Sequence, residues 1–299
     1  MRRNSIHFGT DVATGKPVFV PLDVFKQHMV IRGKTGALKS VYMTYLMSSV
    51  IEQTDSAIIF VDYGGDLFTH NVIKRQAEKN GRTFRLFSTG FQNDWDSFDP
   101  LRACLPLSKE TLVRAASYLV TALSLHHGEG FSTSYFGDIS MLTMQDTLNH
   151  CIDSENLRPS IKDFAEVTER TSKAYRKSDV AQAEMALRQL APYPQLQRGE
   201  APSREIRMDR AIESGEIIYG YLPGVMEPTS TKLGAFLAWS AILAAIDRVE
   251  AGLPKKDVYV VLEECSVIAR SPSFAKALVL GRKYGVRLIM LHQLSLIHI

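Results

Sequence analysis

The sequence predicts an α/β protein with a mainly parallel sheet flanked by helices, and with an all-α segment inserted into it. Three observations support this fold class. Strand-like and helix-like runs alternate over the first hundred residues, and the alternation returns after residue 205. The strand-like runs are apolar throughout, as in parallel strands that are covered on both faces. Between the two parts, residues 108–190 contain one helix-like run after another. One sheet with inserted helices is therefore the simplest arrangement.

The composition is that of an ordinary globular protein. The chain has 299 residues, of which 45% are hydrophobic and 22% charged, so it has room for one large domain or two smaller ones. A net charge of +3 neither demands nor excludes a nucleic-acid partner. Cys104, Cys151 and Cys265 lack metal-ligand spacing, which is typical of reduced thiols in a cytosolic protein. The apolar segment at 233–246 is shorter than a membrane-spanning helix, and no signal-peptide core follows the basic N-terminus.

The first part of the chain begins with a predicted β-hairpin and continues with alternating strands and helices. The hairpin covers residues 5–27 and is expected to lead into the core, because Val18-Phe19-Val20 lies between turn signals. The elements expected after it are a strand at 29–31, a helix at 41–51, a strand at 57–61, a helix at 67–80 before Gly81, and a strand at 83–87.

The middle and last parts complete the predicted organisation. Helices are expected after a cap at 108–111, at 134–151, from residue 159, and at 178–190. Strands are expected at 217–222, 258–262 and 286–291, with helices at 229–249 and 273–284 between them. The predicted domain boundaries are 1–104 for the first part of the sheet domain, 105–204 for the all-α subdomain and 205–293 for the second part.

A glycine-bearing turn between the strand at 29–31 and the following helix has the spacing of a phosphate-binding loop. Its residues are Gly33, Lys34, Thr35, Gly36, Ala37, Leu38, Lys39 and Ser40. In such a loop, backbone N–H groups hold phosphate oxygens, Lys39 reaches the outer phosphates, and the Ser40 hydroxyl binds Mg²⁺. Leu38 stands where the pattern has its second glycine, and its Cβ makes the backbone conformation of that position costly.

Acidic and amide side chains follow other predicted strands, at the end of a sheet where ligands bind. Glu263 and Glu264 follow one strand, and we predict that Glu263 orients Mg²⁺ through water and that Glu264 activates the attacking water. A solvated acidic turn is the alternative for this pair. Gln293 follows the last strand and is a third catalytic candidate with Lys39, although its position alone is weak evidence. Asp62 is a further candidate metal ligand, but a helix N-cap and turn explain Asp62 and Asp66 equally well.

Three basic residues, Arg282, Lys283 and Arg287, lie close together before the last strand. In a ring of subunits one of them would reach a neighbour's phosphate as an arginine finger, and Arg282 is the candidate. A solvated basic surface is the competing interpretation.

Taken in order, these motifs resemble the TraG/TraD-like coupling proteins of conjugation and type IV secretion, within the FtsK/HerA superfamily of motor ATPases. The loop resembles the family's G-x-T-G-S-G-K-S motif, and Val61–Asp66 its D-P-K-G segment. Residues 97–101 lie where the family has N-P-L, and residues 261–264 resemble its Walker B motif. Residues 281–288 with Gln293 resemble its R-x-x-G-V-x-L motif and following Gln. The helical segment falls where such proteins have an all-α domain.

The resemblance implies a RecA-like P-loop NTPase that binds ATP and Mg²⁺. It further implies a homo-hexamer around DNA, sequence-independent DNA contact, and relaxase or secretion-channel proteins as partners. The expected location is the cytoplasm, at the inner face of the bacterial membrane, with any membrane contact indirect or through segments outside this chain. Leu38, Glu263 and Tyr63 depart from the family pattern, where Gly, Asp and Pro are usual.

Two function hypotheses remain open beside a DNA-translocating ATPase. The Leu38 and Glu263 departures favour a catalytically weak, nucleotide-gated scaffold that recruits secretion substrates. An unrelated phosphate-loop enzyme such as a kinase is the third, but the sequence shows no acceptor site for it. The last residues, 294–299, resemble a translated sequencing adapter and are expected to be a non-native tail.

Overall fold

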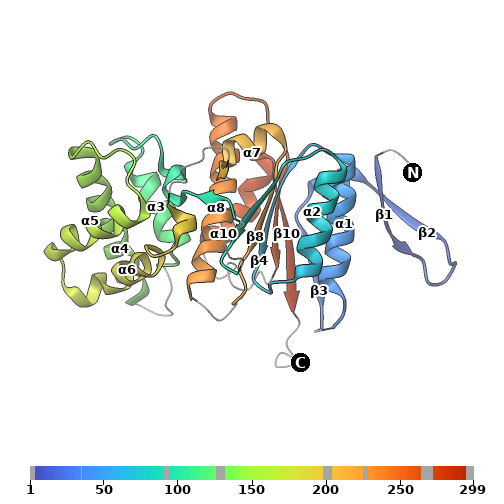
Figure 1. Cartoon of the computed structure of the whole chain (residues 1–299), viewed down its shortest axis with the longest axis horizontal. Helices are drawn as coiled ribbons and strands as arrows, with labels where there is room; N and C mark the ends of the chain where they lie inside the picture. Colours follow the sequence, from blue (N-terminus) through green and yellow to red (C-terminus); the bar gives the residue numbers. More distant parts are fainter. Residues whose placement is uncertain are drawn as a thin grey trace.

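A computed structural model of the chain describes residues 4–34, 36–90, 95–125, 132–197, 204–224, 228–263 and 272–293. Its centre is a six-stranded sheet with the strand order β3-β10-β9-β4-β8-β5, in which every neighbouring pair is parallel (Figure 1). The strands are β3 (Met29–Gly33), β4 (Ala57–Asp62), β5 (Phe84–Ser88), β8 (Ile217–Tyr221), β9 (Val258–Glu263) and β10 (Val286–Gln293). The predicted parallel sheet is confirmed.

The register of the strands brings the predicted site residues to one end of the sheet. Asp62, the last residue of β4, lies opposite Glu263, the last residue of β9. Gln293, the last residue of β10, lies opposite Gly33, the last residue of β3. Since all these strands are parallel, their carboxyl ends share one edge, where open α/β sheets bind ligands.

Helices cover both faces of the sheet, and alternate residues of β4 contact different helices. Ile58 and Phe60 belong to a core with α1 (Lys39–Gln53) and α2 (Leu67–Lys79). Ile59 and Val61 belong to a second core on the opposite face. That face is covered by α7 (Met208–Ser214), α8 (Pro228–Glu250) and α10 (Pro272–Leu280), and the 3₁₀ turn η6 (Gly281–Tyr284) follows α10 (Figure 1). This double coverage explains why every residue of β4 is buried.

A block of helices extends from the second face of the sheet. It contains α3 (Leu112–Ala122), α4 (Ser132–Asp153), α5 (Ile161–Thr171) and α6 (Lys177–Leu190), with the 3₁₀ turns η2 (Pro100–Cys104), η3 (Ser172–Ala174) and η4 (Pro194–Leu196). The chain enters the block through β6 (Ser97–Phe98) and leaves it through β7 (Glu205–Ile206), which pair in parallel. Buried side chains of these helices belong to the same core as α8. The helical block and the second face of the sheet are therefore packed together.

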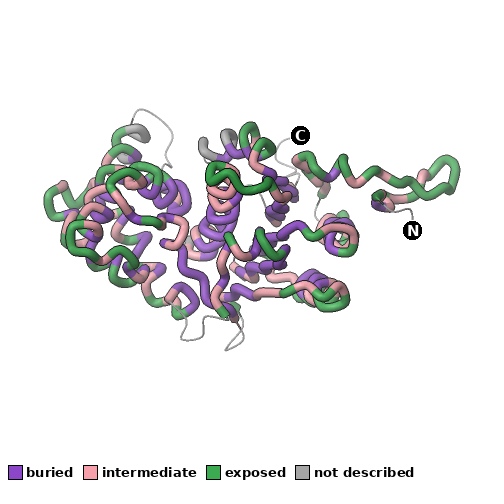
Figure 2. Tube along the Cα trace, turned by 90° about the horizontal axis from the view of Figure 1, so that it is seen from above, coloured by how far each residue is buried: buried purple, intermediate pink, exposed green. Residues whose placement is uncertain are grey.

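The predicted N-terminal hairpin is confirmed, and most of it lies outside the core. Strands β1 (Ser5–Thr10) and β2 (Pro17–Pro21) pair with each other only and project away from the main sheet (Figures 1 and 2). Val18 and Phe19 are each 40% exposed, although Ile6 is buried against the α1 side of the sheet. The short turn η1 (Leu22–Lys26) connects the hairpin to β3. The apolar run at 18–20 thus forms a hairpin strand that is largely exposed.

One helix among the described residues is long and apolar enough to cross a membrane. It comprises Thr229–Glu250 within α8, and 67% of its most apolar window is buried inside the protein. The sequence led us to expect a shorter apolar segment, at 233–246. Burial of this extent is what the central helix of a folded core shows, and α8 packs against both β4 and α3.

Candidate functional site

The phosphate-loop sequence forms a tight turn between β3 and α1. The Ala37 N–H donates to the Lys34 carbonyl oxygen at 3.1 Å, and α1 begins directly at Lys39. Gly36 has a φ of 79°, a left-handed conformation that glycine adopts at little cost. The free N–H groups of the first turn of α1 and its positive dipole end thus face the loop, as in known anion sites. Thr35 lies outside the described residues.

Leu38 adopts the backbone conformation for which the loop pattern normally uses glycine. Its φ is 54° and its ψ is 28°, in the left-handed helical region. For a residue with a Cβ this conformation costs roughly 1–2 kcal/mol. The side chain is 69% exposed, so it regains little through packing. The departure from the motif is therefore a real source of backbone strain beside the candidate site.

Lys39 and Ser40, the two polar residues after Leu38, contact the loop and the end of β9. The Lys39 ammonium donates to the Lys34 carbonyl oxygen at 3.0 Å, so it is folded over the loop. The Ser40 hydroxyl donates to Oε1 of Glu263, which joins the start of α1 to the end of β9. The predicted phosphate and metal residues are thus in direct contact across 223 positions of sequence.

Glu263 and Asp62 form a pair of carboxyl groups at neighbouring strand ends. Oε2 of Glu263 is buried and has no hydrogen-bond partner among the described residues. Burial, and then the adjacent Asp62, raise the pKa of Glu263 above its usual range. A Cβ added to Gly64 would lie 3.5 Å from Oδ1 of Asp62 and 3.8 Å from Oε2 of Glu263, so Gly64 borders the same small space. A proton or a cation is needed there to balance two carboxylates.

Asp62 and Asp66 have different roles. Asp66 caps α2, because its side chain accepts from the Phe68 N–H at 2.9 Å, which supports the capping interpretation for this residue. Asp62 instead holds the preceding turn. Its Oδ1 accepts from the Gly65 N–H and its Oδ2 from the Asp66 N–H, each at 2.9 Å. These bonds support the turn interpretation of Asp62, whereas its position opposite Glu263 keeps it a candidate metal ligand.

A buried tyrosine, Tyr219, contacts Asp62, and the sequence analysis did not identify it. Tyr219 on β8 is fully buried, and its hydroxyl donates to Oδ2 of Asp62 at 2.8 Å. The residue lies in an apolar strand-like run, where a tyrosine carries no signal that distinguishes it from core. Only the pairing of β8 with β4 shows that it faces Asp62.

The structure describes only part of the two remaining catalytic candidates, Gln293 and Glu264. The backbone of Gln293 lies beside Gly33, next to the loop, but its side chain is outside the described part of the structure. Glu264 lies outside the described residues altogether. Their predicted catalytic roles therefore stay predictions.

Arg282 lies far from the phosphate loop of its own chain. It belongs to η6, which precedes β10, and therefore lies at the amino-terminal edge of the sheet. There it borders an open hollow of about 410 Å³ that is also lined by Lys26, Lys255 and Lys283. Arg287 differs from its neighbours, since its guanidinium is buried and contacts Asp257 at 2.7 Å. Arg287 therefore has a structural role, whereas Arg282 is exposed to solvent.

The donor set fits magnesium better than a soft metal. No group of three or more His, Cys, Asp or Glu side chains that could hold a metal occurs among the described residues. Cys104 and Cys151 are buried thiols, and burial raises the pKa of Cys151 to about 11. By contrast, the hydroxyl and carboxyl oxygens of Ser40, Glu263 and Asp62 are hard ligands, which Mg²⁺ uses together with water and nucleotide phosphates. No donor in the described part of the chain contacts the buried Oε2 of Glu263, which supports this assignment.

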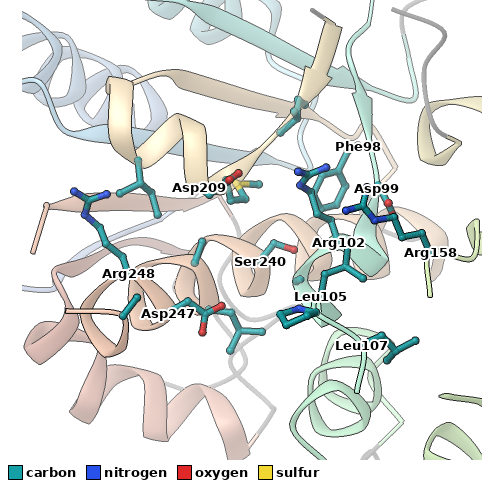
Figure 3. A pocket seen from close by; sticks show the side chains of 18 of the residues that line it. Phe98, Asp99, Arg102, Leu105, Leu107, Arg158, Asp209, Ser240, Asp247 and Arg248 are labelled. Carbon is teal, nitrogen blue, oxygen red and sulfur yellow. The ribbon is translucent and has the colours of Figure 1, made fainter. Parts of the chain in front are cut away.

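A separate cavity of about 620 Å³ lies at the junction of the helical block and the sheet (Figure 3). Its walls come from η2, α7 and α8, with apolar side chains such as Leu105. Charged groups on the wall are already paired: Arg102 contacts Glu205 at 3.1 Å, and Asp209 contacts Arg207 at 2.6 Å. These residues are remote in the fold from the strand ends that carry Ser40 and Glu263, so the cavity is distinct from the candidate site.

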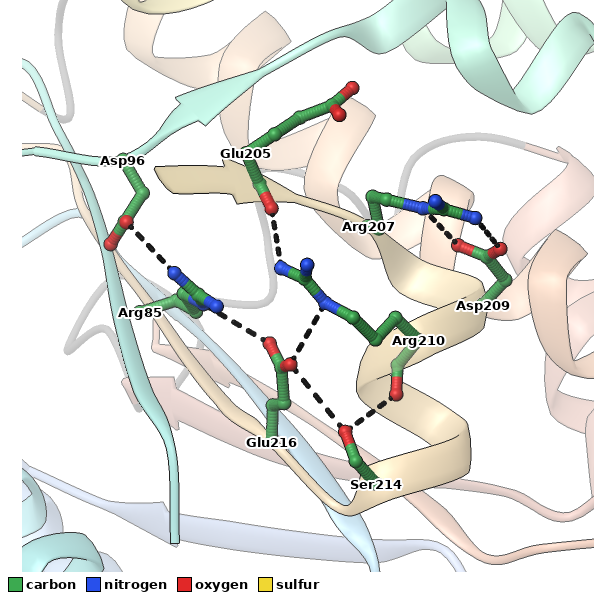
Figure 4. Close-up of polar contacts among 8 residues, drawn as sticks. All are labelled: Arg85, Asp96, Glu205, Arg207, Asp209, Arg210, Ser214 and Glu216. Atoms are coloured by element: carbon green, nitrogen blue, oxygen red, sulfur yellow. Dashed lines mark hydrogen bonds and ion pairs between the residues drawn. The ribbon is translucent and has the colours of Figure 1, made fainter. Parts of the chain in front are cut away.

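Buried ion pairs beside the junction join β7 and α7 to the sheet (Figure 4). Arg85 on β5 contacts Asp96 at 3.4 Å and Glu216 at 3.3 Å. Arg210 on α7 contacts the same Glu216 at 3.0 Å. Because both carboxylates are buried and paired with arginine, we interpret the group as structural.

Comparison with known proteins identifies similar structures but no similar sequence family. No protein-family model matches the chain, and no curated protein matches it either. The bacterial conjugative coupling protein TrwBdeltaN70, in its unbound form, is similar with a TM-score of 0.65 and 17% identity over 98% of this chain and 66% of that chain. The plasmid coupling protein TrwB in complex with ADP and Mg²⁺ gives 0.63 and 17%, over 95% and 66%. VirB4 of Thermoanaerobacter pseudethanolicus gives 0.58 and 16%, over 97% and 77%.

These similarities establish the fold, which is that of a RecA-like P-loop NTPase. The chain spans about two thirds of the length of the TrwB chains that it matches.

Proposed function

We propose that this chain is a P-loop ATPase that binds Mg-ATP at residues 33–40 and uses hydrolysis to move DNA, or to deliver a nucleoprotein substrate, to a type IV secretion channel. The hydrogen bond from the Ser40 hydroxyl to Glu263 carries the proposal. It joins the phosphate loop to the acidic strand end, which a Mg-nucleotide site requires and which a chance glycine turn does not explain. Similarity in fold to TrwB, whose structures include complexes with ADP and Mg²⁺, supports it.

Each residue has a role in this proposal. Backbone N–H groups of the loop and of the first turn of α1 hold the phosphates. Lys39 exchanges its bond with the Lys34 carbonyl for the outer phosphates. Ser40, Glu263 and Asp62 would hold Mg²⁺, with Glu263 acting through water, and the bound ion would supply positive charge beside the transferred phosphoryl group. Glu264 activates the attacking water, and the Gln293 amide contacts the γ-phosphate or that water.

A homo-hexamer would bring a second subunit to the site. Arg282 is exposed at the opposite edge of the sheet from the loop, so it can serve only a neighbouring subunit. The basic hollow shared with Lys255 and Lys283 would be attracted to a neighbour's nucleotide phosphates. We further propose sequence-independent DNA contact, relaxase or channel proteins as partners, and a location in the cytoplasm at the inner face of the bacterial membrane.

The second candidate is a catalytically weak, nucleotide-gated scaffold. The strained backbone at Leu38 and the presence of Glu263 where related motors use Asp favour it. DNA-stimulated ATP turnover separates the two. For a motor, turnover rises when DNA is added, Lys39→Ala abolishes it, and Glu264→Gln binds ATP without hydrolysing it. If ATP binds but DNA leaves turnover unchanged, the motor reading is overturned and the scaffold is favoured. Normal hydrolysis by Glu264→Gln would refute the assignment of the base.

A further inference from the structure

Three strands contribute to one line of polar contacts at the carboxyl edge of the sheet. The Tyr219 hydroxyl on β8 donates to Asp62 on β4, Asp62 lies opposite Glu263 on β9, and Glu263 accepts from Ser40. Tyr219 is the end of this line that is farthest from the loop. It lies in the same core as α1 and α2, and no solvent reaches it.

The ring of Tyr219 is held on several sides. It stacks on Phe60 with ring centroids 5.4 Å apart, and it forms an edge-to-face pair with His70, whose ring centroid is 5.3 Å away. A ring that is packed in this way keeps its hydroxyl in one place. The oxygen atom of Tyr219 is consequently a fixed donor 2.8 Å from Oδ2 of Asp62.

The donors around Asp62 fix the orientation of its carboxyl group. Gly65 N–H holds Oδ1, and Asp66 N–H with the Tyr219 hydroxyl holds Oδ2. Three donors on two oxygens restrict the rotation of this carboxyl group. The facing Glu263 accepts from Ser40 through one oxygen, and its second oxygen is buried with no donor to it among the described residues. The arrangement therefore places one carboxyl group of fixed orientation opposite a second carboxyl group.

We propose that Tyr219 is a positioning residue for the divalent cation, because it holds Asp62 against Glu263 so that the pair binds Mg²⁺ with the nucleotide. The inference rests on the proposed nucleotide site. Groups that orient metal-binding carboxylates typically change metal affinity by about 10–100-fold when they are removed. Tyr219→Phe keeps the ring and its packing, and it removes only the donor to Asp62.

The test is a metal titration in the presence of ADP. Mn²⁺ binding is measured by electron paramagnetic resonance, and Mg²⁺ binding by the concentration that raises the thermal unfolding midpoint of the ADP-saturated protein. We expect the metal concentration at half-saturation to be at least about tenfold higher for Tyr219→Phe. Its affinity for ADP without metal should equal that of the unchanged protein. Tyr259→Phe is the matched control, since Tyr259 is a buried tyrosine of the same core on β9.

Asp62→Asn provides a second variant, and it should weaken metal binding in the same direction. Equal metal midpoints for Tyr219→Phe and the unchanged protein would overturn the proposal, even if the variant unfolds at a lower temperature. Normal metal binding by Asp62→Asn would overturn it as well. Failure of the unchanged protein to bind ADP with metal would instead refute the nucleotide site itself, so the two failures are distinguishable.

Discussion

At the scale of single residues, Leu38 introduces backbone strain into the phosphate loop. Its backbone lies in the left-handed region, and Gly36 two residues earlier does so too. Leu38 has a Cβ, which makes this conformation costly, whereas Gly36 adopts it at little cost. The loop sequence predicted this difficulty, because the position of a missing glycine identifies where an unusual φ is required.

Replacement of Leu38 by glycine should relieve the strain. We expect the free energy of unfolding to rise by about 1 kcal/mol, since the gain in the folded state exceeds the entropy that glycine adds to the unfolded chain. Chemical denaturation measures the change. Leu38→Ala is the control, because alanine shortens the exposed side chain and retains the Cβ. Equal stabilisation by both variants would show that the side chain, rather than the backbone, is responsible.

Other residues of the site were less accessible to prediction. The spacing of Lys39 and Ser40 after Gly33 is a local pattern, so it could be recognised in the sequence. Tyr219 contacts Asp62 only because two strands far apart in the chain are neighbours. No local pattern records that contact, and its discovery required the strand order.

At the scale of elements, His28 joins three parts of the sheet domain just before β3. Its Nε2 contacts the Leu278 carbonyl oxygen at 2.9 Å, at α10, and its Nδ1 accepts from the Leu288 N–H of β10 at 3.0 Å. A neutral ring with the proton on Nε2 satisfies both contacts. Protonation of Nδ1 would remove the acceptor for Leu288, so the junction depends on the neutral form.

This junction predicts a pH dependence of stability. Burial lowers the pKa of His28 from its ordinary value of 6.5, although the Leu278 carbonyl opposes the shift. The unfolded chain therefore binds a proton more readily than the folded one, and this stabilising contribution, complete above 6.5, declines as the pH falls through the lowered pKa.

Denaturation curves from about pH 7 to about pH 5 should show a smaller loss of stability for His28→Gln than for the unchanged protein. His150→Gln, at an exposed histidine of α4, is the control and should follow the unchanged protein. Parallel curves for His28→Gln and the unchanged protein would refute the role of His28.

The elements themselves were largely predictable, but the burial of each element was not. Continuous apolar runs such as 57–61 indicated strands covered on both faces, and the structure buries them. The run at 18–20 has the same character but forms an exposed hairpin strand. Composition cannot separate these cases, because burial of a short apolar run depends on what the rest of the chain packs against it.

At the scale of the whole molecule, the fold brings the ends of β3, β4, β9 and β10 to the carboxyl edge of the sheet. The helical block leaves this edge intact, since β6 and β7 pair where the chain departs and returns. The block nonetheless shares its core with α8, which also packs on β4. The strand ends and the helical block are thus connected through one packed core. Strand order and shared core are tertiary features, which sequence periodicity does not contain.

The central claim is that this edge is a Mg-nucleotide site, and nucleotide binding tests it most directly. Calorimetry with a non-hydrolysable ATP analogue, with and without Mg²⁺, would be compared for the unchanged protein, Lys39→Ala and the surface control Lys79→Ala. We predict one nucleotide per chain, bound more tightly with Mg²⁺, and at least about tenfold weaker binding for Lys39→Ala only, a loss of about 1.4 kcal/mol. Absence of binding, or equal affinity for Lys39→Ala and the unchanged protein, would contradict the account.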